Sequence, residues 1–141
     1  MPQDRIVAVH VGLIRRPRRF AIQRKNGAGR DTYEVFLPRT LREYVVQLLT
    51  TLNEVRPDFM ARLAQLDDNQ WMKSKHKTRR YVAEHRDHVY INTDWLTDQS
   101  TEKVLGYWVA TNIGRKEAWA IVSLACEAAG VRQESIYRLQ L

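Results

Sequence analysis

The pattern of apolar and polar residues predicts three strands at the start of the chain. A run rich in Val and Ile covers residues 5–13, and apolar and polar side chains alternate over residues 19–24 and 32–37. Between the second and third runs, Asn26-Gly27-Ala28-Gly29 is a strong turn signal. We therefore expect a three-stranded antiparallel β unit, with its hairpin at residues 25–30 and its end at Pro38.

Two amphipathic helices are predicted next. Apolar residues recur at three- and four-residue spacing over residues 41–55, and Thr40 stands where an N-cap belongs. A second, short helix is expected over residues 57–66, with Asp67-Asp68-Asn69 at its end. The two helices would form a pair that covers a sheet.

The rest of the pattern contains short strands and one long helix. Strands are expected at residues 80–83 and 107–110, and residues 93–105 are expected to be loop. Residues 88–92 fit a short strand or an extended loop, and residues 131–141 fit a short helix or a strand. A helix is predicted over residues 114–129, with Gly130 as its C-cap.

These elements predict an α+β fold. A small antiparallel sheet would pack with the helix pair and the long C-terminal helix, preceded by the N-terminal β unit. The expected domains are residues 1–39, the β unit, and residues 40–141.

The start of the last helix is the most informative feature. The turn Thr111-Asn112-Ile113-Gly114 leads directly into Arg115 and Lys116. A helix N-terminus carries partial positive charge and unpaired N–H groups, so acidic residues are usual there. Two cations at this place favour an anionic ligand such as phosphate. The alternative is a solvated helix start, with Glu117 offsetting part of the repulsion.

The overall charge also favours a polyanionic partner. The net charge is +7 and the pI is about 9.9, which fits DNA, RNA or an anionic membrane surface. One basic segment has no acidic residue between Asp68 and Glu84; its cations are Lys73, Lys75, Lys77, Arg79 and Arg80. A second basic run covers residues 15–25, where a solvated sheet edge is an equal alternative to backbone contact with nucleic acid.

Several classes of function find little support. The single cysteine, Cys126, cannot build a disulfide framework or a thiolate metal cluster, and it is expected to be a buried free thiol. The spacing His85-x-x-His88 matches no strong zinc pattern. We therefore expect no catalytic residues, no metal and no cofactor. No apolar run is long enough to span a bilayer and the N-terminus is not a signal peptide, so a cytoplasmic location is expected.

Three strings of residues together resemble a known family. They are KTRRYVA at 77–83, Leu105-Gly106-Tyr107-Trp108-Val109, and TNIGRK at 111–116 followed by the long helix. Over roughly residues 40–137 the chain is similar to the C-terminal DNA-binding domain family of SeqA, and the first 39 residues have no counterpart there. The resemblance implies recognition of double-stranded DNA at GATC sites, with preference for the hemimethylated state.

The resemblance also implies roles for individual residues. Asn112 would read bases in the major groove, and Thr111, Ile113 and Gly114 would shape the loop, with Ile113 able to contact a methyl group. Arg115, Lys116, Arg79 and Arg80 would anchor phosphates. The loop is two residues shorter than in the family, and residues 86–90 compete with 79–83 as the arginine-rich strand.

The sequence therefore predicts a non-catalytic protein that binds duplex DNA and associates with the nucleoid. The N-terminal β unit would add backbone contacts or build a homodimer. One alternative is a binder of RNA or single strands, whose exposed aromatic residues stack on bases. The other is a small metal-dependent nuclease or toxin that uses His85 and His88.

Overall fold

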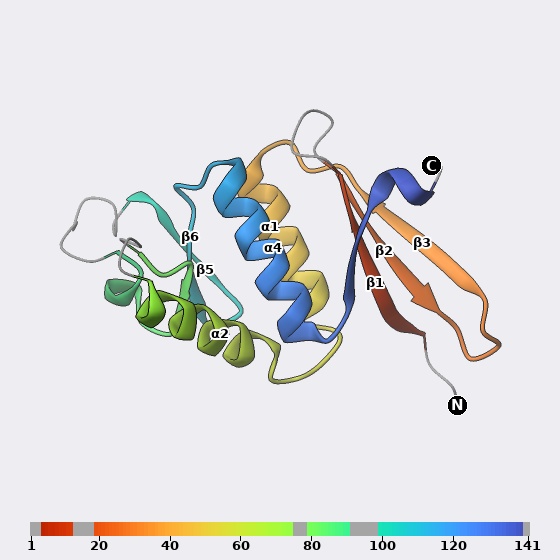
Figure 1. Cartoon of the computed structure of the whole chain (residues 1–141), viewed down its shortest axis with the longest axis horizontal. Helices are drawn as coiled ribbons and strands as arrows, with labels where there is room; N and C mark the ends of the chain where they lie inside the picture. The colour runs from red at the N-terminus through yellow and green to blue at the C-terminus, as the bar shows by residue number, and fades with distance from the viewer. Residues whose placement is uncertain (1–3, 13–18, 75–78, 91–98, 140–141) are drawn as a thin grey trace.

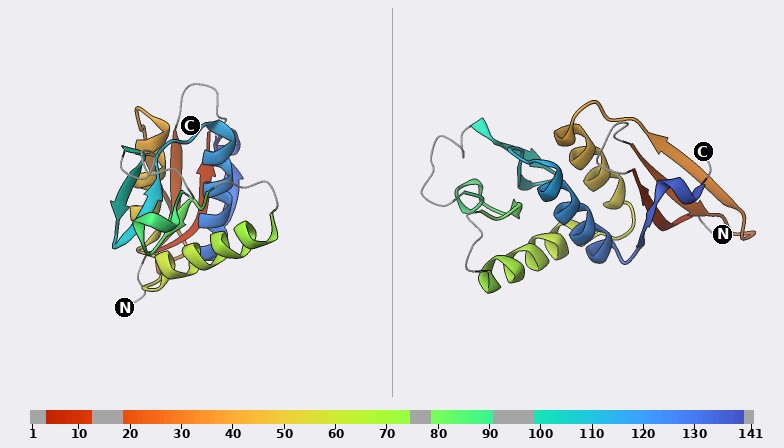
Figure 2. Two further views of the ribbon diagram at one scale, coloured as in Figure 1. Left: turned by 90° about the vertical axis from the view of Figure 1, so that its left-hand side faces the viewer. Right: turned by 45° about the horizontal axis from the view of Figure 1, so that its top comes forward.

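The computed structural model describes residues 4–12, 19–74, 79–90 and 99–139. Two β-sheets lie on either side of helices α1 and α4 (Figures 1 and 2). The α+β class is thereby confirmed. In chain order the elements are β1 (Arg5–Val11), β2 (Phe20–Lys25), β3 (Asp31–Phe36), α1 (Leu41–Leu52), α2 (Phe59–Lys73), β4 (Val82–Ala83), the 3₁₀ turn η1 (Arg86–His88), β5 (Thr101–Val104), β6 (Tyr107–Ala110), α4 (Arg115–Ala129), β7 (Arg132–Ser135) and the 3₁₀ turn η2 (Ile136–Leu139).

The first sheet contains the predicted N-terminal strands and one strand from the other end of the chain. Its order is β3-β2-β1-β7, and the antiparallel β2–β3 hairpin is confirmed. In the hairpin turn, the Asn26 side chain accepts hydrogen bonds from the N–H groups of Ala28 and Arg30, each at 2.9 Å. Strand β7 pairs in parallel with β1, so the tail that the sequence left open begins as a strand.

A buried histidine links three strands of this sheet. His10 on β1 is only 2% exposed, and its Nε2 forms a 2.8 Å hydrogen bond with Oε1 of Gln23 on β2. Its Nδ1 lies 3.5 Å from Oε2 of Glu134 on β7. The hydrogen bond joins β1 to β2, whereas the contact with β7 is a close approach without a hydrogen bond.

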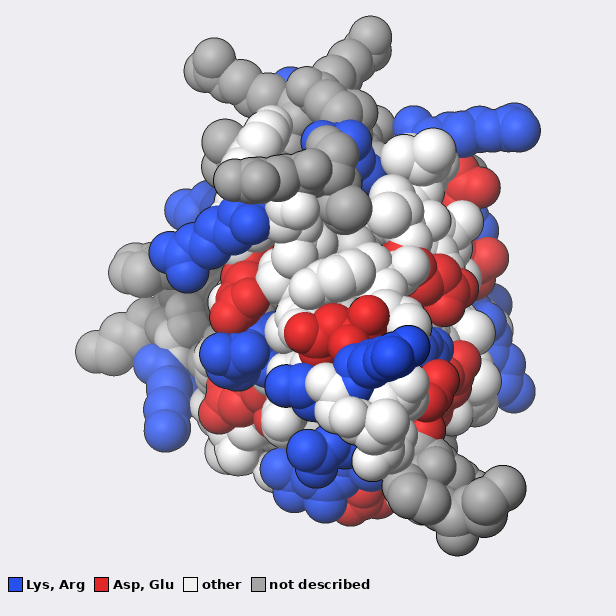
Figure 3. All heavy atoms as spheres, turned by 90° about the vertical axis from the view of Figure 1, so that its right-hand side faces the viewer, with Lys and Arg blue, Asp and Glu red and all other residues white. Residues whose placement is uncertain are grey.

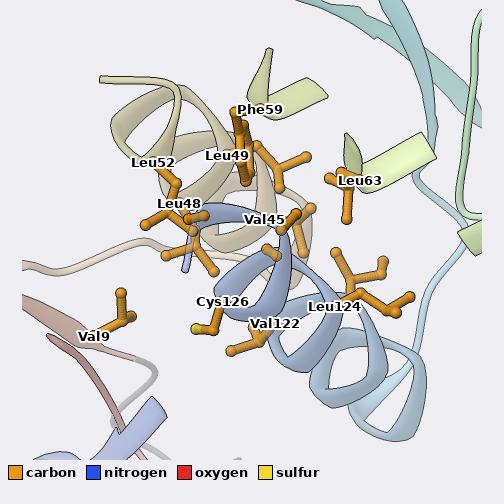
Figure 4. Close-up of a cluster of buried hydrophobic side chains, with 14 of the residues drawn as sticks. Val9, Val45, Leu48, Leu49, Leu52, Phe59, Leu63, Val122, Leu124 and Cys126 are labelled. Atoms are coloured by element: carbon orange, nitrogen blue, oxygen red, sulfur yellow. The ribbon is translucent and has the colours of Figure 1, made fainter. Parts of the chain in front are cut away.

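One hydrophobic cluster joins the first sheet, the helices and the second sheet. Phe20 and Ile22 of β2 are fully buried in it, together with Leu48 and Leu49 of α1. Figure 4 shows α1, α2 and α4 contributing side chains to the same contact region. Residues on both sides of the predicted 39/40 boundary therefore share a single core. Burial of such side chains is the main favourable term in folding.

The second sheet has the order β4-β6-β5 and is antiparallel. The sequence prediction of a loop over residues 93–105 is wrong at its end, because residues 101–104 form strand β5. Residues 91–98 lie outside the described residues. The β5–β6 turn consists of Leu105 and Gly106, both at positive φ (51° and 86°), as a two-residue type I′ hairpin turn requires. Because leucine rarely adopts positive φ, the local sequence gave a weak hairpin signal.

The helices differ from the prediction mainly at the end of α2. Thr40 caps α1 as expected, since its Oγ1 accepts a 3.0 Å hydrogen bond from the N–H of Glu43. The predicted end of the second helix at Asp67-Asp68-Asn69 is wrong, because α2 continues to Lys73. The reason is tertiary: Asp67 is buried inside the helix and its carboxylate binds the backbone of residues 81 and 82. None of the described helices combines the length and apolar character that crossing a bilayer requires.

The helix α4 begins and ends where the sequence placed it. Gly130 adopts the left-handed conformation of a C-cap at φ 71°. Cys126 is buried on the same helix, which confirms its prediction as a buried free thiol. Burial raises the pKa of the Cys126 thiol from 9.0 to about 12.

This shifted pKa makes stability depend on alkaline pH. The unfolded thiol ionises above its pKa of 9.0 while the folded thiol stays protonated up to about 12, so the folded state binds more protons in that window. The free energy of unfolding should therefore fall as pH rises through it, by about 1.4 kcal/mol between neutral pH and about pH 10 from this group. Urea denaturation at the two pH values measures the loss.

The Cys126→Ala variant provides the control. It should retain only the part of the loss contributed by other groups, such as Tyr44, whose pKa burial also raises. If the free energy of unfolding of Cys126→Ala depends on pH as it does in the native chain, the thiol is not the source of that dependence.

Candidate nucleic-acid interface

The predicted reading loop connects β6 to α4 and is held at both ends. The N–H of Thr111 donates to the carbonyl oxygen of Ser100 at 2.8 Å. Ile113 is partly buried and packs against the main core and against a second cluster formed by Ala83, Val89, Tyr90 and Ala110. Asn112 between them is exposed, and its side chain makes no hydrogen bond within the described part of the chain. The backbone is thus fixed while the amide faces solvent.

The first turn of α4 has one acidic residue, Glu117, and both of its carboxylate oxygens have partners within the chain. Gly114 is the N-cap, and its N–H donates to Oε2 of Glu117 at 3.1 Å. The other oxygen, Oε1, lies 3.5 Å from Nη2 of Arg79. Arg115 and Lys116 are exposed and form no ion pair with any described residue. The helix start therefore presents two uncompensated cations beside its own partial positive charge.

Arg79 lies near the loop but is not a free cation. Its side chain is 17% exposed and pairs with Glu117. Its guanidinium also lies 5.9 Å from the ring centroid of Tyr81 and 5.7 Å from that of Tyr90. Such contacts hold the guanidinium in place. The geometry gives Arg79 a positioning role: it orients the carboxylate that caps the loop.

Arg80 points to other partners. Its Nε donates to Oδ1 of Asp68 at 2.7 Å, and its guanidinium stacks 3.9 Å from the ring centroid of Trp71. Its Nη1 also donates to the carbonyl oxygen of His88 at 3.1 Å. Arg80 thus borders a groove of about 390 Å³ between α2 and β4, and does not join the 111–116 loop.

Of the remaining cations of the basic segment, Lys73 belongs to the part of the chain that the structure describes. Lys73 lies in the last turn of α2, where a positive charge complements the helix dipole. Lys75 and Lys77 lie outside the described residues, as do Arg15, Arg16 and Arg18 of the first basic run.

The two candidate arginine-rich segments, residues 79–83 and 86–90, pair with each other through their backbones. Arg79 and Tyr90 form an isolated antiparallel β-bridge, and the N–H of Arg80 donates to the carbonyl oxygen of Val89 at 2.8 Å. The first segment continues into strand β4, which pairs with β6. Residues 86–88 instead form the turn η1.

A basic and aromatic surface beside the loop was missed by the sequence reasoning. Trp108 on β6 is partly exposed, with the guanidinium of Arg86 at 5.7 Å and the ammonium of Lys103 at 5.9 Å from its ring centroid. Lys103 stands opposite Trp108 in the β5–β6 ladder. The Leu105-Gly106 turn could have indicated this surface, because a hairpin at that turn places Lys103 across from Trp108.

The histidine pair has no metal-binding surroundings in the described structure. The rings of His85 and His88 meet edge to face, with their centroids 5.2 Å apart. No group of three or more potential metal ligands occurs among the described residues.

Comparisons of the chain with protein-family models, with curated proteins and with solved structures found no match. The assignment of a function therefore depends on the geometry of the chain itself.

The structure predicts that Asp67 fixes the segment leading to the site. Its carboxylate accepts hydrogen bonds from the N–H groups of Tyr81 and Val82 at 2.6 and 2.9 Å. The variant Asp67→Asn replaces these charge-assisted bonds with weaker neutral ones, so we expect a loss of about 1.5–3 kcal/mol in the free energy of unfolding. Urea denaturation followed by circular dichroism measures this loss.

Gln65→Ala is a suitable comparison on the same helix. Among the described residues the side chain of Gln65 bonds only to Asn69, on an exposed face, so its replacement should leave stability nearly unchanged. Equal stability of Asp67→Asn and the native chain would show that the carboxylate does not hold β4.

Proposed function

We propose that the chain is a non-catalytic protein that binds duplex DNA and reads a short site through residues 111–116. One observation carries the proposal: the exposed amide of Asn112 forms no hydrogen bond within the described structure, and it precedes a helix start at which the exposed Arg115 and Lys116 pair with no described residue. An Asn side chain can bond bidentately to adenine in the major groove, and the two cations can hold the adjoining phosphates.

The rigidity of the loop supports base reading over loose charge attraction. Ile113 is anchored in two hydrophobic clusters, and Gly114 is bonded to Glu117. A pre-organised loop loses little conformational entropy on binding, so more of the contact energy is available for discrimination between sequences.

The neighbouring sheet offers a second contact region. Lys103 is exposed beside Trp108 on the strand pair that leads into the loop. Phosphates of a duplex that occupies the loop would meet this cation, and the net charge of +7 would favour the encounter at low salt. Such a protein would associate with the nucleoid.

The role of Arg79 and Arg80 is revised in this proposal. Because both guanidiniums have carboxylate partners within the chain, they support the site and do not act as the principal phosphate anchors. Arg115 and Lys116 take that role, with Lys75 and Lys77 as further candidates from the sequence.

The first experiment measures sequence discrimination. GATC duplexes are the first to test, because of the resemblance to the SeqA family. Fluorescence anisotropy would compare unmodified, hemimethylated and fully methylated GATC duplexes with a scrambled duplex and a single strand. We expect one duplex to bind most tightly, and Asn112→Ala to remove that preference at a loss of about 1–3 kcal/mol. If Asn112→Ala still prefers the same duplex, the reading role of the loop is contradicted.

A single strand is included because Trp108 is a partly exposed aromatic residue flanked by cations. Tighter binding of the single strand than of every duplex would favour base stacking and replace the proposal.

The second experiment measures phosphate contact. Lys116→Gln should weaken binding to all duplexes alike and reduce the slope of log affinity against log salt by about one. Arg30→Gln removes another exposed cation, in the β2–β3 turn, and should change neither quantity. Equal effects of the two variants would indicate nonspecific attraction to the whole surface.

A further inference from the structure

The ion pair between Arg79 and Glu117 closes the C-terminal end of the 111–114 loop. Nη2 of Arg79 lies 3.5 Å from Oε1 of Glu117, and Oε2 of the same carboxylate accepts the N–H of Gly114 at 3.1 Å. The carboxylate is therefore shared between a cation and the backbone of the N-cap. Loss of the guanidinium would remove one of the two contacts that orient it.

The other end of the loop is linked to Arg79 through Tyr90. The guanidinium lies 5.7 Å from the ring centroid of Tyr90, and the Tyr90 hydroxyl donates to the carbonyl oxygen of Ser100 at 3.1 Å. That carbonyl oxygen also accepts the N–H of Thr111 at 2.8 Å. Because Thr111 directly precedes the exposed Asn112, the contacts of Arg79 reach both flanks of the base-reading side chain.

The Arg79–Glu117 pair is held more tightly than an ordinary surface ion pair. At the end of the molecule formed by the first sheet, acidic and basic side chains are interspersed on the open surface (Figure 3). In that sheet Lys25 and Asp31 lie 3.9 Å apart and are 42% and 38% exposed, and pairs of this kind contribute little stability because water screens them. The side chain of Arg79 is 17% exposed and lies against two aromatic rings, which restrict its rotamers. This pair can therefore fix a geometry.

The partner of this guanidinium matters for specificity. Phosphate contacts add affinity for every sequence, whereas discrimination comes from base edges. A guanidinium that left Glu117 for a phosphate would strengthen all complexes alike, and it would release the carboxylate that caps the loop. A guanidinium that stays on Glu117 keeps the loop in the geometry that base reading requires.

We propose that Glu117 determines specificity at the proposed site, because it keeps Arg79 away from the DNA backbone and fixes the loop that presents Asn112. This inference rests on the proposed function. Arg79 is a positioning residue that acts through Glu117, and Glu117 acts through the N–H of Gly114. The presence of an acidic side chain beside a phosphate-binding helix start is thereby explained, since its charge is used by Arg79.

Two readouts separate this role from phosphate anchoring: the ratio of affinities for the preferred and the scrambled duplex, and the slope of log affinity against log salt. Arg79→Gln should lower the ratio by about tenfold and leave the slope unchanged, because the side chain holds the loop and contacts no phosphate. A phosphate anchor would do the reverse, with a slope smaller by about one and an unchanged ratio. Arg79→Lys should keep more of the ratio than Arg79→Gln, since an ammonium group can still pair with Glu117.

Glu117→Gln should lower the ratio and make the slope steeper by about one, because the released guanidinium gains a phosphate contact. The double variant Arg79→Gln/Glu117→Gln should return the slope to its native value, since it has no guanidinium to release. Glu127→Gln is the matched control, because it removes an exposed carboxylate from the last turn of the same helix and changes the net charge equally. It should change neither readout, and circular dichroism should show every variant folded.

The outcomes separate this inference from the proposed function. Suppose that the native chain prefers one duplex and Asn112→Ala abolishes the preference. If Arg79→Gln then keeps the ratio or lowers the slope, the inference is overturned and the proposed function stands. A slope that stays steep in the double variant would also overturn it, because the gain would come from loss of the carboxylate alone. If the native chain binds all duplexes alike, the proposed function fails and the specificity role of Glu117 fails with it.

Discussion

A single buried carboxylate positions the end of the molecule that carries the candidate site. Asp67 lies within α2, is 1% exposed, and accepts hydrogen bonds from the N–H groups of Tyr81 and Val82. A buried charge is tolerated only where such donors satisfy it, so the carboxylate and the start of β4 hold each other in place. Since β4 pairs with β6, and β6 leads into the 111–114 loop, the position of the loop follows from this contact.

The pairing of charges decides which cations remain available to a ligand. Arg79 holds Glu117, and Arg80 is bound by Asp68 and stacked on Trp71. The pairing of Arg79 with Glu117 offsets the charge of the one acidic group in the first turn of α4. The count of basic residues in a sequence therefore overstates the charge that a partner meets, because partly buried arginines are used internally.

The candidate site and the edge strand β3 belong to different sheets. Helices α1 and α4 separate the first sheet, whose edge is β3, from the second sheet, which carries the loop (Figure 1).

The sequence by itself determined the elements whose signals are local. The hairpin at residues 25–30, the cap at Thr40, the core face of α1 and the helix Arg115–Ala129 with its C-cap Gly130 follow from turn residues, capping side chains and apolar spacing, which act over a few residues. It also located the exposed Asn112 and the cations that follow it.

Only the tertiary structure decided where α2 ends, that residues 101–104 form a strand, and that β7 joins β1. Each depends on partners distant in sequence: the N–H groups of residues 81 and 82, the ladder of β6, and the first strand of the chain. The same holds for Arg79 and Arg80, whose charge is visible in the sequence but whose carboxylate partners are brought near only by folding.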